Sequence, residues 1–219
     1  MTAIDLAALH EEARARAAAC PEGTPLDPAA AALIALGVAA SVTALDRDAI
    51  GRTIAGAFDA GASVAQVQEV LALVSGLGVH SLMASAGAVL DEAARRGLVV
   101  ADAPLDAERE ALWQRHVGSD PFWTGFAREV PGFLDSLLRL SPDIFTAFFD
   151  YCAVPWRSGT VRAATKELVA MACDACPSHR FRPGLRLHLA NAIKLGVGRR
   201  AIGQALDIAA AAPEHSGCG

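Results

Sequence analysis

The sequence predicts an all-helical protein in which a three-helix unit occurs twice. No segment shows sustained alternation of apolar and polar residues, so strands are not expected. Helix start and stop signals recur along the chain, and shifting it by 135 residues lays residues 28–81 over 163–216 without a gap. With 53% hydrophobic residues among 219, the chain can bury a large core. A helical bundle with an internal duplication is therefore the expected fold.

The first half is predicted to hold five helices, at residues 5–19, 28–43, 46–61, 63–77 and 81–96. The first is an amphipathic leader that ends before Pro21. Asp27 and Pro28 read as an N-cap followed by a first-turn proline. Ser63 with Gln66 three residues later is typical of a capping box.

We divide the chain into three segments. Residues 1–100 form a first repeat with its leader helix and a structural role, and residues 161–219 form a second repeat that carries the site. Residues 101–160 are predicted to be an aromatic-rich helical connector, broken at Pro121, Pro131 and Pro142. Its last part, VPWRSG at 154–159, is expected to be a rigid link to the final three helices.

Charge and composition exclude several classes of protein. A net charge of -5 and scattered basic residues argue against nucleic-acid binding. Asp5 and Glu11 stand where a signal peptide would be basic or apolar, so a cytoplasmic protein is expected. The uncharged stretch 28–45 is Ala- and Gly-rich, which favours a buried helix over a membrane span. Five cysteines do not indicate a disulfide scaffold.

The repeat provides an internal control for function. In the alignment, Glu167 lies over Ala32 and His188 lies over Thr53. The second copy carries several polar residues that the first lacks at matched positions: Glu167, His179, Arg186, His188 and Asn191. This asymmetry favours one chemical site per chain, in the second copy.

The expected chemistry is acid–base catalysis by Glu167, His179 and His188. A buried Glu167 could give or take a proton near neutral pH, and His188 lies at the edge of an apolar helix face, where it could line a cleft. The alternatives are an exposed first-turn glutamate, a core or interface histidine at 188 and a solvated loop histidine at 179.

Substrate binding is assigned to residues that surround these three. Arginine side chains hold carboxylates in bidentate pairs, and each one could instead be a surface or subunit-interface charge. Trp156 could wall the pocket or belong to the core. The predicted set is Trp156, Arg180, Arg182, Arg186 and Asn191.

The stretch KELVAMACDACPSHRFRPGLRLHLANAIKLG, together with VPWRSG, resembles the carboxymuconolactone decarboxylase / alkylhydroperoxidase D-like (AhpD-like) family, and most closely its members with two copies in one chain. The resemblance is strong in residues 154–212 and weak in the first copy. It implies an all-helical AhpD-like bundle, and for a two-copy chain a homotrimer. The family includes decarboxylases, which are lyases, and thiol peroxidases.

Cys173 and Cys176 form a CxxC that raises the peroxidase alternative. Both fall late in their predicted helix, where the helix dipole disfavours a thiolate. In the peroxidases that the sequence resembles, the CxxC opens the next helix, and residues 181–184 occupy that position here. We therefore favour apolar packing for the pair, and no metal site, because only Asp174 and His179 could complete one.

Three function classes follow. We favour a cofactor-independent, decarboxylase-like enzyme acting on a small carboxylated or carbonyl-bearing molecule, with an anion suggested by the arginines. A thiol peroxidase using Cys173 and Cys176 and a non-catalytic oligomeric binding protein are the alternatives. No membrane or nucleic-acid partner is expected.

Overall fold

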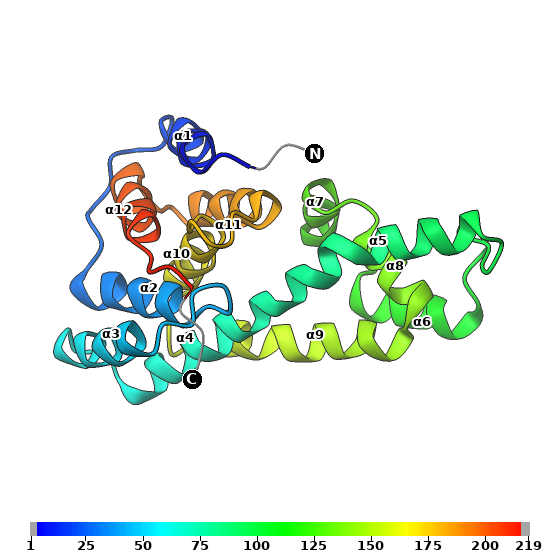
Figure 1. Ribbon diagram of the computed structural model, residues 1–219, viewed down its shortest axis with the longest axis horizontal. Coiled ribbons are helices and arrows are strands. Elements are labelled where there is room, and N and C mark those ends of the chain that lie inside the picture. The colour runs from blue at the N-terminus through cyan, green and yellow to red at the C-terminus, as the bar shows by residue number, and fades with distance from the viewer. Residues whose placement is uncertain (1–3, 216–219) are drawn as a thin grey trace. The chain divides into compact units, whose positions relative to one another are not determined.

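The computed structural model describes residues 4–215, which form helices and no strand (Figure 1). The predicted all-helical class is confirmed. The elements are α1 (Leu6–Ala17), α2 (Pro28–Ala40), α3 (Arg47–Asp59), α4 (Val64–Ser75), the 3-10 helix η1 (Gly76–Val79), α5 (His80–Arg95), α6 (Ala107–His116), α7 (Pro121–Glu129), α8 (Phe133–Leu140), α9 (Pro142–Arg157), α10 (Ala163–Asp174), α11 (Arg182–Lys194) and α12 (Arg199–Ala210).

The chain forms two compact units whose bounds differ from the three predicted segments. Unit 1 comprises the residues up to Leu77 and those from Pro155 onward, and unit 2 comprises Gly78–Val154. Both predicted repeats therefore contribute to one unit. Helix α5, which we expected within the segment 1–100, belongs to unit 2, because α4 runs through η1 directly into it.

Unit 1 is built around α2 and α10, which pack against each other. Helix α2 also contacts α3, α4 and α12, while α10 contacts α11, α12 and α4 (Figure 1). The leader α1 packs on α11 and α12. The caps act as predicted, since Asp27 accepts from Ala30 N and Ser63 with Gln66 forms the capping box.

The helices of unit 1 follow the 135-residue offset closely. Helices α3 and α4, shifted by 135, have the bounds of α11 and α12. The two non-glycine residues with positive φ among those described, Leu45 (φ 44°) and Arg180 (φ 50°), are also related by this offset. So are Gly61 (φ 88°) and Gly196 (φ 82°), which end corresponding helices. The two halves therefore share turn geometry as well as helix order, which supports the predicted duplication.

Contacts between the halves are reciprocal in the same numbering. Leu26 N donates to Gln204 Oε1 at 2.7 Å, and at the matched positions Val161 N donates to Glu69 Oε2 at 3.3 Å. Asp27 and Arg162, themselves 135 residues apart, form an ion pair of 2.7 Å. Such exchanged contacts are the pattern of a two-fold interface.

Unit 2 contains the aromatic cluster. The predicted breaks are confirmed, since Pro121 and Pro142 begin α7 and α9 and Pro131 lies between α7 and α8. Phe133 and Phe145 are fully buried. The link at 154–159 was wrong in part, because α9 continues to Arg157 and contains a proline at 155.

One helical stretch of the described chain, Val64–Arg95, is long and apolar enough to cross a membrane by length and composition alone. A third of its most apolar window is buried within the protein. Core helices of soluble proteins pass the same test, so this is weak evidence for a span. The apolar stretch noticed in the sequence forms the 13-residue α2, most of which is buried.

Replacing Gly37 by Ala is expected to destabilise the α2–α10 packing. A Cβ at Gly37 would lie 2.6 Å from Val169 Cγ1, and valine has little rotamer freedom in a helix. We expect a loss of about 1–3 kcal/mol in the free energy of unfolding, measured by urea denaturation. The control is Gly56→Ala in α3, where a Cβ meets nothing within 4 Å and helix propensity should add about 0.5–1 kcal/mol. Equal stability of the two variants would contradict this account.

Candidate functional site

Helix α10 is the element that assembles the site. Every side chain from Thr165 to Asp174 is buried, and three of these ten residues are charged: Lys166, Glu167 and Asp174. An ionised group that leaves water is costly unless it finds a charged or hydrogen-bonding partner. The partners of these three side chains therefore show what surrounds the helix.

Glu167 pairs with His188 of α11. His188 Nδ1 lies 2.7 Å from Glu167 Oε2 and donates to it. The residue Glu167 is 7% exposed and the His188 side chain 15% exposed, so little water competes for this bond. The alternative of an exposed first-turn glutamate is wrong. Two of the three residues expected to transfer protons are in direct contact.

The environment of His188 favours its protonated form. Burial by itself lowers the imidazole pKa, but the hydrogen bond to Glu167, the charge of Glu167 and the charge of Asp174 together raise the pKa above the ordinary 6.5. A protonated imidazole held by a carboxylate is a general acid, and its conjugate base can take a proton back. The pair can therefore act in either direction near neutral pH.

Trp156 lies beside His188. The indole and imidazole planes differ by 6°, and their ring centroids are 6.2 Å apart. Trp156 is 38% exposed, so part of its surface faces away from the core. The residue belongs to the last turn of α9, and its assignment as a wall of the substrate pocket stays a prediction. The apolar ring shields one side of the imidazole from water.

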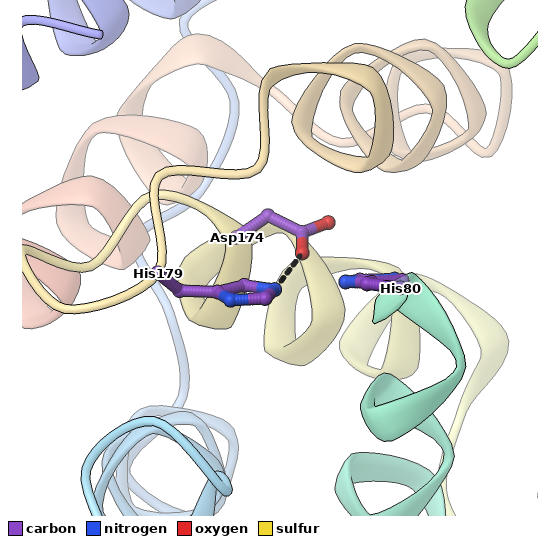
Figure 2. A group of neighbouring side chains, drawn as sticks. All are labelled: His80, Asp174 and His179. Carbon is purple, nitrogen blue, oxygen red and sulfur yellow. Dashed lines mark ion pairs between the residues drawn. The ribbon is translucent and has the colours of Figure 1, made fainter. Parts of the chain in front are cut away.

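His179 is held by Asp174, at the turn between α10 and α11. Figure 2 shows the two side chains pointing toward each other, with His179 Nε2 3.4 Å from Asp174 Oδ1. Asp174 is fully buried, and a Cβ on Gly184 would lie 2.2 Å from its Oδ2. Carboxylate and imidazole are both groups that can bind zinc.

The three arginines make contacts other than those predicted. Arg180 Nε donates to Pro177 O at 2.7 Å, and its Nη1 donates to Ile4 O at 3.2 Å. Arg186 Nε lies 2.6 Å, and Arg182 Nε 3.6 Å, from the carboxylate of Glu12 in α1. The bond from Arg186 is the main cause that lowers the pKa of Glu12. These side chains fasten the leader helix to α11 and its preceding turn.

The sequence could not reveal this use of the arginines, because Glu12 is 170 or more residues distant in the chain. Asn191, the remaining residue assigned to substrate binding, lies partly buried on α11. Substrate binding by these four polar residues stays a prediction.

Cys173 and Cys176 are free thiols and fully buried. Burial, first of all, and the charge of Asp174 raise the pKa of the Cys173 thiol well above its usual value. Cys176 Sγ lies 3.4 Å from Ser178 Oγ. A reactive thiolate needs a lowered pKa and access to its substrate, and Cys173 has neither. Cys218 lies outside the described residues.

Sequence reasoning missed a second buried ion pair, between Lys166 and Glu69. Lys166 is 2% exposed, and its Nζ lies 2.5 Å from Glu69 Oε1. It also donates to Pro155 O and Ser158 O at 2.6 and 2.7 Å. The available signal was a lysine inside an apolar helix whose matched position in the first copy is Ala31.

Comparison with known proteins gives one informative match. A crystal structure from Burkholderia xenovorans LB400 is 30% identical in sequence and superposes with a TM-score of 0.73, covering 95% of this chain and 91% of its own. It is named as a gamma-carboxymuconolactone decarboxylase subunit, an activity that the name assigns provisionally. No protein-family model and no curated protein matches the chain.

Replacing Glu167 by Gln should lower the pKa of His188. In the native protein we expect the imidazole to titrate above 6.5, and in Glu167→Gln below it, because burial then dominates. The stability that the extra proton confers is present below the unfolded pKa of 6.5 and is lost as pH rises through the raised folded value. NMR titration of the imidazole signals between pH 5 and 9 measures the His188 pKa in the native protein and in Glu167→Gln. The signal of His188 is identified by its absence from the spectrum of His188→Gln. An unchanged titration in Glu167→Gln would contradict the pairing.

Proposed function

This chain belongs to the carboxymuconolactone decarboxylase / AhpD-like family, and we propose that it is a cofactor-independent acid–base enzyme in which Glu167 and His188 move one proton on a small carboxylated or carbonyl-bearing molecule. The observation that carries this proposal is the 2.7 Å contact between a buried carboxylate and an imidazole of raised pKa. An imidazole held by a carboxylate can donate and accept a proton, which is what general acid–base catalysis requires.

We assign a decarboxylation to this pair, by analogy with the name of the similar structure. The bond between the substrate carbon and its carboxylate breaks, CO2 leaves, and the electron pair moves into a conjugated carbonyl of the substrate. The His188 imidazolium then gives its proton to the carbon, and solvent returns a proton to the imidazole. Glu167 fixes the ring through Nδ1 and stabilises its charged form, which leaves Nε2 to act on the substrate.

Trp156 supports this chemistry by limiting access of water to the imidazole. In a site of low polarity, the attraction between Glu167 and the imidazolium is stronger than in water. The indole also offers an apolar surface to the conjugated part of a substrate. The same surroundings favour loss of CO2. A charged carboxylate is less stable in a site of low polarity than in water, whereas CO2 is neutral.

Turnover of gamma-carboxymuconolactone, followed by CO2 release, tests the proposal. We expect activity in the native protein and a loss of about 10²-fold or more in kcat for Glu167→Gln and for His188→Gln. Glu92→Gln, which changes an exposed glutamate of α5 in unit 2, should keep full activity. An inactive native protein, or full activity in both site variants, would contradict the proposal.

The thiol peroxidase alternative makes a separate prediction. Cys173→Ala and Cys176→Ala should leave CO2 release within about threefold of the native rate, because neither thiol is assigned a role in proton transfer. The native protein should not consume hydrogen peroxide in the presence of dithiothreitol, since the Cys173 thiol is buried and its pKa is raised. Peroxide consumption that either alanine variant abolishes would establish the peroxidase instead.

A further inference from the structure

The buried ion pair of Lys166 and Glu69 has no part in the proton transfer proposed above. The three N–H groups of the Lys166 ammonium meet three acceptors: the carbonyls of Pro155 and Ser158 and one oxygen of Glu69. The second Glu69 oxygen accepts from Ser158 Oγ at 2.6 Å and from Val161 N at 3.3 Å. Every one of these contacts outside the pair itself falls on residues 155–161.

The surroundings of Glu69 favour its ionised form. Burial is the largest single influence on Glu69 and by itself would raise its pKa. The hydrogen bonds from Lys166 and Ser158, the charge of Lys166 and the Val161 N–H together outweigh burial and lower that pKa. A buried ion pair is often no more stabilising than apolar residues of the same size. The pair therefore calls for an explanation other than stability alone.

Residues 155–161 contain Trp156, whose ring lies parallel to that of His188. Pro155 lacks an N–H, so the helical bond that would hold the last turn of α9 in place is missing there. Lys166 instead bonds the carbonyls on either side of Trp156, those of Pro155 and Ser158. The end of α9, which lacks one bond of its own ladder, is thus also held from the side by Lys166 of α10.

The matched contact between the two halves provides a control for the charge. Gln204, at the position matched to Glu69, accepts from Leu26 N just as Glu69 accepts from Val161 N. A neutral amide is therefore enough for the backbone contact, and the negative charge of Glu69 is needed only for Lys166. Lys166 itself is matched by Ala31. The charged pair therefore occurs at only one of the two matched contacts between the halves, the one that involves α10, which also carries Glu167.

We propose that Lys166 and Glu69 are positioning residues, which hold the segment 155–161 so that the indole of Trp156 lies against the imidazole of His188. This inference rests on the proposed function for its purpose, but its geometry is testable without a substrate. A positioning role differs from a purely stabilising role of the ion pair. It predicts that removing the pair changes the contact of Trp156 with His188 while the protein stays folded.

The test uses fluorescence of Trp156 in a Trp113→Phe, Trp123→Phe background, since the chain has three tryptophans. A protonated imidazole in contact with an indole quenches its emission, so emission should rise with pH through the pKa of His188. The variant is the double substitution Lys166→Met, Glu69→Gln, which leaves no buried charge unpaired and copies the amide of Gln204. We expect it to fold, to lose the pH-dependent rise and to give acrylamide readier access to Trp156.

Further variants separate the outcomes. Asp27→Asn with Arg162→Met removes an exposed ion pair next to α10. It should leave the pH-dependent rise in Trp156 emission, called the emission step below, unchanged. A folded double variant with an unchanged step would overturn the proposal. If the double variant does not fold, Glu69→Gln alone, which keeps the backbone contacts, must reduce the step, and an unchanged step there would overturn it equally.

Activity distinguishes this proposal from the proposed function. We expect kcat for CO2 release to fall about tenfold or more in the double variant, and the pH profile to shift with the His188 pKa. If the native protein releases no CO2 but the emission step is present and is lost in the double variant, the positioning role stands and the decarboxylase proposal fails. If CO2 release and its pH profile are native in the double variant, the positioning role fails alone.

Discussion

The arrangement of unit 1 depends on a helix that is buried on all sides and yet charged. Helix α10 carries a lysine, a glutamate and an aspartate among ten consecutive buried residues. None of the three can be accommodated by apolar packing, so each determines the position of a neighbouring element. Lys166 holds the end of α9, Glu167 holds α11 through His188, and Asp174 lies at the turn that joins α10 to α11. The chemical site is the place where these neighbours meet.

Much of this could be predicted from local sequence. The caps at Asp27, Asp46 and Ser63 define helices whose structural bounds begin one residue later. The contact of Glu167 with His188 could be expected because the two residues lie on consecutive helices joined by a short turn. The comparison of the two halves also drew attention to them. The first signal is local, since the two residues are 21 positions apart, and the second compares positions that are 135 residues apart.

The rest depended on partners far away in the chain. Arg186 was assigned to a substrate anion because arginine pairs with carboxylates, and in the structure it contacts the carboxylate of Glu12 in α1. Lys166 was overlooked, since Glu69 belongs to the other half. An ion pair of high sequence separation leaves no periodic signal, so composition and spacing could not reveal either one. The structure was needed to reveal that Arg186 contacts the leader helix.

The beginning of α11 illustrates how one position can serve different chemistry. A helix N-terminus attracts negative charge, and here the Asp174 carboxylate lies against Gly184, where any side chain would collide with it. By the family resemblance, residues 181–184 correspond to the position at which the peroxidases carry their cysteines. In this chain the carboxylate of Asp174 lies at the start of α11, and the two thiols are buried at the end of α10, before the turn.

The ion pair between Asp27 and Arg162 has an implication for how such a molecule is assembled. The two residues hold the same position in the two halves and contact each other. They therefore lie next to the two-fold axis that relates the halves. Two identical chains joined in this way would bring two aspartates, or two arginines, face to face and repel. Covalent linkage removes that restriction, because each half can then carry the opposite charge. The single polypeptide thus permits an asymmetric seam that a pair of separate, identical subunits could not form.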